Sequence, residues 1–196
     1  VFAPLCFALT LIRRLGRTRD DREPPAPRSI LFVKLAEQGS TVLAAGAIRR
    51  ATAMVGRDNV YFLVFEENRF ILDVMDLIPP QNVFTVPTHT LAGMAIGALS
   101  ALRRIRGRRI DAAIDLEFFA RFSAVLTLLS GASWRVGLHA YFGEGPYRGD
   151  LMTHRVLYNP HLHTSQLFGV LVEAMTVAAA ELPTFERPDK TPESSG

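Results

Sequence analysis

Cysteine is almost missing from this 196-residue chain, which contains one, Cys6. A single thiol excludes an intrachain disulfide framework and fits a reducing compartment. Cys6 lies within an apolar run, where we expect a small buried or lipid-facing side chain rather than a reactive thiol. The fold must therefore be held by an apolar core, and 48% hydrophobic residues is an ordinary content for a globular protein.

The body of the chain also lacks an excess of charge of either sign. The net charge is +3, and the arginine-rich residues 1–28 account for all of it, which leaves the remainder neutral. A neutral domain has no general electrostatic footprint for phosphate backbones. We therefore expect no nucleic-acid partner.

No apolar stretch is long enough to cross a bilayer. Residues 1–12 are mostly apolar, but a helix of that length extends about 18 Å, against a hydrocarbon core of about 30 Å. Arginines follow this run directly, which favours a cytoplasmic location for that side. We predict that residues 1–14 are a truncated membrane-associated segment, with an ordinary packed helix as the alternative. Residues 15–28 are interpreted as a basic, Pro-rich linker.

A dinucleotide-binding fingerprint and a P-loop are both absent, because the glycines after the first apolar run have neither spacing. From residue 29 onward, short apolar runs alternate with longer segments of helical period. This alternation predicts an α/β fold, a Rossmann-like parallel sheet with helices on both faces, within residues 29–182. The expected strands are 30–33, 59–65, 83–86, 110–116 and 134–137. The expected helices are 41–55, 70–77, 90–106, 118–129 and 164–180, and 139–157 is expected to be a long loop.

The segment after the first expected strand is the strongest candidate site, because ligands of parallel sheets bind beyond the carboxyl ends of strands. Gly39 lets the backbone approach a ligand closely, and Ser40 or Thr41 is expected to cap the next helix. Glu37 is a carboxylate at the mouth of this site and a candidate general base. The alternative is a plain strand-to-helix turn with a solvated Glu37.

Several segments resemble the opening half of glycosyltransferase family 9, the heptosyltransferase-like proteins. The matching features are an apolar strand with a basic residue and a Gly-containing loop, an Arg-x-Asp strand before an arginine-bearing helix, and a Leu-Ser-Gly-Ala turn. They occur, in the family's order and spacing, at residues 30–43, 109–121 and 129–138, and are followed by Thr153-His154-Arg155 and His163.

The resemblance implies the N-terminal domain of a two-domain GT-B glycosyltransferase. In that family the N-terminal domain binds the acceptor, and the C-terminal domain holds a nucleotide-activated sugar, often ADP-heptose. We interpret residues 183–196 as a linker to such a donor domain, so we expect little or no transferase activity from these residues alone. No resident cofactor is expected.

One departure from the family pattern affects the catalytic assignment. The family's Gly-Asp supplies an aspartate as catalytic base, and the aligned position here is Ser40. A serine hydroxyl cannot accept a proton at neutral pH as a carboxylate can. We predict that Glu37, three residues earlier in the same loop, is the base, with Glu117 as the second choice.

Substrate contacts are expected from polar residues that follow the expected strands. For Arg121, an ion pair with Glu117 is an equal alternative to binding an acidic group. His161 and His163 lack a convincing third ligand, so no metal site is expected. The predicted substrate-binding residues are Lys34, Gln38, Gly39, Ser40, Thr41, Glu117, Arg121, His139 and Arg148.

The function that this reasoning predicts is transfer of a sugar, heptose or similar, from a nucleotide-activated donor to a lipid-linked or cell-surface glycan acceptor. The expected location is the cytoplasmic face of the inner or cell membrane. Two alternatives belong to other classes. One is a non-catalytic binding or scaffold domain, which the Ser40 replacement favours. The other is a different Rossmann-like enzyme, which the missing glycine fingerprint disfavours.

Overall fold

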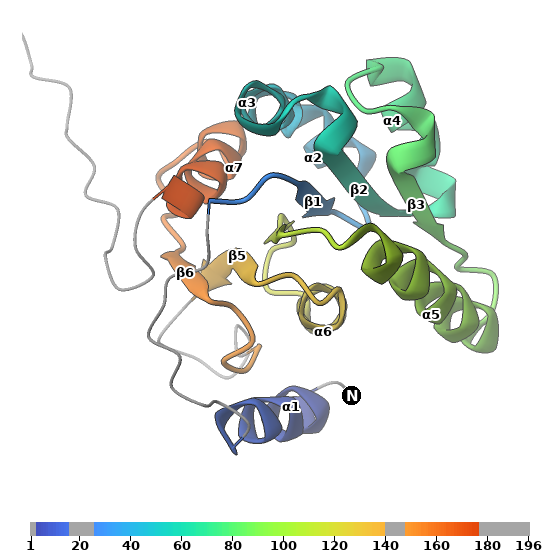
Figure 1. Cartoon of the computed structure of the whole chain (residues 1–196), viewed down its shortest axis with the longest axis vertical. Helices are drawn as coiled ribbons and strands as arrows, with labels where there is room; N and C mark the ends of the chain where they lie inside the picture. The colour runs from blue at the N-terminus through green and yellow to red at the C-terminus, as the bar shows by residue number, and fades with distance from the viewer. Residues whose placement is uncertain (1–2, 16–25, 140–147, 177–196) are drawn as a thin grey trace, which may run out of the picture.

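The computed structural model of the chain describes residues 3–15, 26–139 and 148–176 (Figure 1). The predicted segment 183–196 lies outside the described residues, and so does most of the predicted linker 15–28. The predicted domain boundaries therefore stay predictions.

Six parallel strands form one sheet in the order β3-β2-β1-β4-β5-β6 (Figure 1). Ile30 of the central strand pairs with Val60 on one side and with Ala112 on the other. The strand order reverses at this point, and parallel sheets bind ligands beyond the carboxyl ends of the strands at such a reversal. The strands are β1 (Ile30–Val33), β2 (Val60–Phe65), β3 (Val83–Val86), β4 (Ala112–Asp115), β5 (Trp134–His139) and β6 (His154–Leu157).

Helices cover both faces of the sheet, as the sequence predicts (Figure 1). The strands supply side chains to both faces, since Ile30 and Phe32 lie in one apolar core and Leu31 and Val33 in the other. The first core is closed by α2 (Gln38–Leu43), α3 (Ala45–Val55), α4 (Arg69–Met75) and α7 (Thr164–Glu173). The second is closed by α5 (Leu91–Arg108) and α6 (Arg121–Leu129).

A further helix, α1 (Ala3–Leu15), forms an outer layer on α6 (Figure 1). Cys6 is fully buried there and packs with Ala124, Val125, Leu151 and Met152. Residues 3–15 thus form a helix packed on the domain, and its predicted association with a membrane stays a prediction. Among the described residues, none of the helices combines the length and apolar character needed to cross a membrane.

The structure differs from the sequence-based expectations in two helices. The expected helix 41–55 is two helices that meet at Ala44, and the first of them already begins at Gln38. Ser40 and Thr41 therefore do not cap it. Their hydroxyl groups instead donate to the Glu37 carbonyl oxygen from inside the first turn. The expected helix 164–180 begins at Thr164 but becomes a 3-10 turn at Ala174–Thr176. His163 occupies its cap position and accepts from the Ser165 backbone N–H.

One strand was not expected. β6 lies within the segment 139–157, which the sequence predicts to be a loop. It is one of the two edge strands of the sheet, and its His154 and Val156 are buried while Arg155 and Leu157 are exposed. Only two apolar side chains in four residues gave too weak a pattern to predict a strand from the sequence.

Candidate active site

The turn between β1 and α2 lies where the strand order of the sheet reverses. Lys34 continues β1, and its backbone N–H still donates to Leu63 of the neighbouring strand. The carbonyl oxygen of Leu35 accepts from the Phe65 backbone and from the Asn68 side chain, at 3.1 and 3.0 Å. The neighbouring strand β2 therefore fixes one side of this turn.

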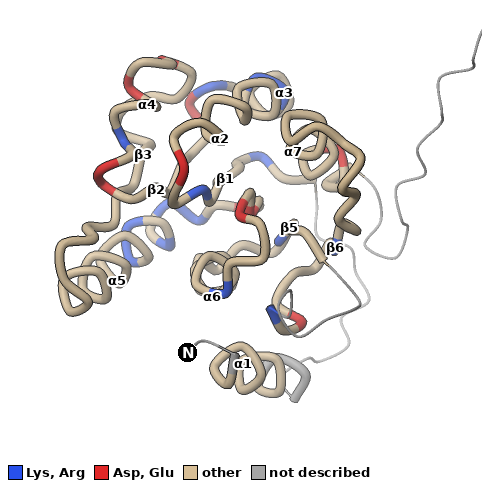
Figure 2. Tube along the Cα trace, turned by 180° about the vertical axis from the view of Figure 1, so that it is seen from behind, with Lys and Arg blue, Asp and Glu red and all other residues tan. Residues whose placement is uncertain are grey.

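Glu117, just beyond β4, fixes the other side of the turn. Its Oε1 accepts from the backbone N–H groups of Leu35 and Ala36, at 2.7 and 3.0 Å. Its Oε2 lies 3.2 Å from Nζ of Lys34, a side chain with no exposed surface. Figure 2 shows the acidic and basic segments that gather near the end of β1. Glu117 is thus a buried clamp between β1 and β4, and each of its carboxylate oxygens already accepts a hydrogen bond.

Glu37 holds an exposed carboxylate at the outer end of the same turn. Its side chain is 68% exposed, and its Oε2 lies 3.4 Å from Lys34 Nζ and 3.1 Å from Ser40 Oγ. Its backbone adopts a left-handed conformation, with φ of 67°. Such a conformation is costly for a residue with a side chain and is concentrated at functional sites. The fold therefore presents one oriented carboxylate to solvent at the strand reversal.

A second buried ion pair lies directly behind this turn. Nη1 of Arg148 lies 2.6 Å from Oδ2 of Asp115, and both side chains are almost fully buried. Asp115 also accepts from the Ser123 hydroxyl and the Glu117 backbone, while Arg148 donates to the Leu138 carbonyl. Burial raises the pKa of Asp115, and the Arg148 guanidinium and the two hydrogen bonds oppose that rise. The pair ties the segment before β6 to the ends of β4 and β5.

The structure brings together only some of the predicted site residues. Lys34, Glu37, Ser40 and Glu117 are linked by direct contacts, and Arg148 reaches the Glu117 carbonyl at 3.5 Å. Gln38 and Gly39 are exposed in the first turn of α2, whereas Thr41 is fully buried. Substrate contact by any of them stays a prediction.

Two predicted residues lie further along the same edge. Arg121 is half-buried at the start of α6, and His139 is half-buried at the end of β5. The pKa of His139 is lowered, first by burial and then by Arg155 and Arg148, while Asp150 opposes the change. The Glu117 carboxylate contacts Lys34, Leu35 and Ala36 of the first turn. The two alternatives for Arg121, an ion pair with Glu117 or binding of an acidic group, stay predictions.

Two contributors to the site were missed from the sequence: Asp115 and Ser123. Asp115 had a usable signal, since a carboxylate that ends a buried apolar strand requires a partner. Ser123 had none, because its partner is 8 residues away in sequence.

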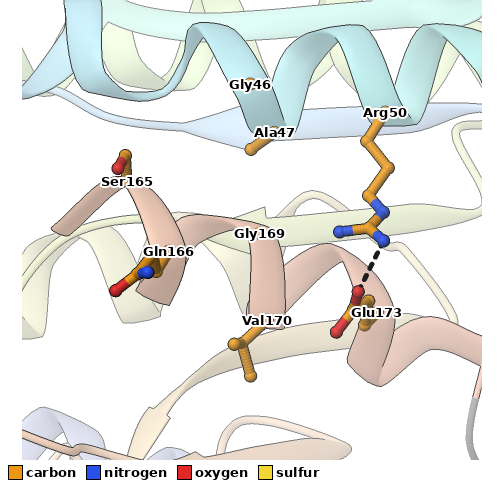
Figure 3. A pocket seen from close by; sticks show the side chains of 8 residues that line it. All are labelled: Gly46, Ala47, Arg50, Ser165, Gln166, Gly169, Val170 and Glu173. Atoms are coloured by element: carbon orange, nitrogen blue, oxygen red, sulfur yellow. Dashed lines mark ion pairs between the residues drawn. The ribbon is translucent and has the colours of Figure 1, made fainter. Parts of the chain in front are cut away.

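A pocket of about 470 Å³ lies between α3 and α7, away from this turn (Figure 3). Its two charged side chains, Arg50 and Glu173, bond to each other at 2.6 Å. Small residues make up much of the remaining wall, such as Gly46, Ala47 and Gly169. Ser165 and Gln166 add polar side chains to the wall (Figure 3). Within residues 3–15, 26–139 and 148–176, no group of three or more potential ligands could hold a metal ion.

The sequence matches no family model and no curated protein sequence. Solved structures do match the fold. One is a glycosyltransferase family 9 protein from Veillonella parvula, at 14% identity and a TM-score of 0.62, which covers 76% of this chain and 41% of that one. The E. coli heptosyltransferase WaaC, solved with ADP-2-deoxy-2-fluoro heptose, is 16% identical with a TM-score of 0.63, over 81% of this chain and 50% of that one.

The E. coli ADP-heptose lps heptosyltransferase II is 19% identical with a TM-score of 0.58, over 79% of this chain and 44% of that one. The chain thus spans half or less of the length of these proteins. Similarity at such low identity establishes the fold alone, so the function has to be argued from the residues of the site. The chain has the Rossmann-like fold found in GT-B glycosyltransferases of family 9, among them heptosyltransferases.

Proposed function

We propose that this chain is the acceptor-side part of a glycosyltransferase that moves a sugar, heptose or similar, from a nucleotide-activated donor. The observation that carries the proposal is the position of Glu37. Its exposed carboxylate lies at the strand reversal of a fold shared with family 9 glycosyltransferases. Parallel sheets bind their ligands at that point.

Glu37 is proposed as the general base. Its carboxylate takes the proton from an acceptor hydroxyl while the acceptor oxygen bonds to the anomeric carbon of the sugar. The bond from that carbon to the nucleotide diphosphate breaks in the same displacement. Lys34 and Ser40 contact Oε2 of Glu37 and orient the carboxylate, which leaves Oε1 for the acceptor.

The donor site is proposed to lie in a second domain outside these residues. The matched transferases are about twice as long as the matched part, and one of them was solved with an ADP-heptose analogue. The proposed acceptor is a lipid-linked or cell-surface glycan, and the proposed place of action is the cytoplasmic face of the inner or cell membrane.

A non-catalytic binding domain is the second candidate function. It is favoured by Ser40, which stands where the family pattern has an aspartate and cannot itself act as a base at neutral pH. The contact between Ser40 Oγ and Glu37 argues for the catalytic alternative, because it gives Ser40 a role in orienting a carboxylate in the same loop.

The test is a transfer assay on the complete protein of which this chain forms part. A panel of nucleotide sugars that includes ADP-heptose is supplied with a glycolipid acceptor, and the release of nucleotide diphosphate is measured together with the mass of the acceptor. The proposal requires both signals with at least one donor. If every donor stays intact while the acceptor still binds, the non-catalytic function replaces it.

A further inference from the structure

The outer face of α1 is apolar, which is the reverse of the usual pattern for a surface helix. Among residues 4–12, the buried residues are Cys6 and the polar Thr10, with Leu9 half-buried. All the exposed ones are apolar, with Phe7 at 62% and Ile12 at 65% exposed. The exposed residues are Pro4, Leu5, Phe7, Ala8, Leu11 and Ile12.

Specific contacts hold α1 in this orientation. The Thr10 hydroxyl accepts from the Asp150 backbone N–H at 2.9 Å and donates to the Cys6 carbonyl at 2.7 Å. Gly149, at a φ of 71°, passes so close that an added Cβ would lie 2.6 Å from Thr10 Oγ1 and 2.8 Å from the Cys6 carbonyl oxygen. The polar contacts are therefore made inward, and the apolar side chains of α1 remain outside.

A second exposed apolar stripe runs along α5. Ile96 is 70% exposed and Leu99 is 56% exposed, and Leu91 at the start of the helix is 82% exposed. The helical spacing continues the stripe from Ile96 and Leu99 to the exposed Arg103. Both α1 and α5 contact α6, on the side of the sheet opposite α3 and α7 (Figures 1 and 2).

Arginines accompany both apolar stretches without any carboxylate. No Asp or Glu occurs in residues 1–19 or in residues 91–110. Within α5 and its end, the arginines are Arg103, Arg104, Arg106, Arg108 and Arg109, and the sequence has more arginines directly after α1. Apolar side chains next to a local excess of arginines suit a surface with acyl chains and anionic headgroups.

We propose that the outer faces of α1 and α5 together bind the surface of an anionic lipid bilayer. Contact between two copies through these faces would place the arginines of both copies against one another without acidic partners. The binding extends the proposed function by bringing the site at Glu37 to a lipid-borne acceptor. It needs no donor, so vesicle binding and sugar transfer succeed or fail separately.

Flotation of the 196-residue chain with vesicles tests this surface. The probes are phosphatidylcholine vesicles with and without about a quarter phosphatidylglycerol. We expect binding to the anionic vesicles, which weakens as salt is raised. Phe7→Gln with Leu11→Gln should lower the bound fraction about tenfold, because both apolar contacts are lost. Arg103→Gln with Arg108→Gln should remove the preference for anionic lipid.

Matched controls come from the opposite side of the sheet. Phe70 and Val74 of α4 are 65% and 63% exposed, so Phe70→Gln with Val74→Gln removes apolar surface of the same kind and should leave binding unchanged. Arg49→Gln on α3 is the control for charge. Circular dichroism confirms that each variant is folded. The proposal is overturned if the wild type does not float, if the α4 pair lowers binding as much, or if the α1 pair only abolishes a concentration-dependent dimer.

Discussion

Lys34 and Glu117 form a buried ion pair of 3.2 Å that joins the carboxyl ends of β1 and β4. These two residues are 83 positions apart in sequence. They meet because the crossover through α5 places β4 beside β1 rather than beside β3. The pair and the two backbone hydrogen bonds to Glu117 hold the turn that presents Glu37.

Loss of the Glu117 carboxylate should destabilise the fold strongly. Glu117→Ala leaves the fully buried Lys34 ammonium without its buried partner and two backbone N–H groups without an acceptor. Breaking such a pair from one side costs about 3–5 kcal/mol. The free energy of unfolding in urea measures the loss. Lys34→Met with Glu117→Leu removes both charges and should be less destabilising than Glu117→Ala. Equal free energies of unfolding for the wild type and Glu117→Ala would contradict the stabilising role of the Glu117 carboxylate.

Arg148 and Asp115 should show a large coupling free energy. Both side chains are almost fully buried and lie 2.6 Å apart. In a double-mutant cycle with Asp115→Ala and Arg148→Met we expect a coupling free energy near the upper end of the range of about 0.5–3 kcal/mol that contacting residues show. The exposed pair Arg57–Asp76 has the same 2.6 Å separation and is the matched control. It should give at most about 1 kcal/mol. Similar coupling in the two pairs would show that burial has no effect here.

His139 should make the fold less stable in mild acid. Its pKa is lowered in the folded state, so the unfolded chain takes up the proton first as pH falls below the ordinary histidine value of about 6.5. The stability is therefore complete above that value and decreases below it, down to the folded pKa. Urea unfolding at several pH values measures this slope. His139→Gln should flatten it, and an unchanged slope would exclude His139 as its source.

Ser40 should contribute to turnover through Glu37. In the complete protein, Ser40→Ala removes one hydrogen bond to the carboxylate, which is worth about 1 kcal/mol, or roughly a fivefold loss in kcat. Ser40→Thr keeps a hydroxyl and should restore most of the rate. Ser133→Ala, an exposed serine before β5, is the control. A loss in Ser40→Ala that Ser40→Thr does not restore would argue against the orienting contact.

Much of the sheet could be predicted from the sequence, because buried parallel strands are continuous apolar runs such as Ile30–Val33. The edge strand β6 could not, since only its alternate residues His154 and Val156 are buried. The turn at Glu37 was located because ligand sites follow strands. The ion pairs around this turn could not be predicted from the sequence. The contacts of Lys34 with Glu117 and of Asp115 with Arg148 depend on which strands lie side by side.

The most direct test of the account is the turnover of the complete protein with Glu37→Gln. If Glu37 is the base, kcat should fall by about 10²–10⁴-fold, because a neutral amide cannot take the proton of the acceptor hydroxyl. Asp58 is an exposed carboxylate directly before β2, at the amino end of the strands, so Asp58→Asn should keep the wild-type rate. Wild-type turnover in Glu37→Gln would contradict the assignment.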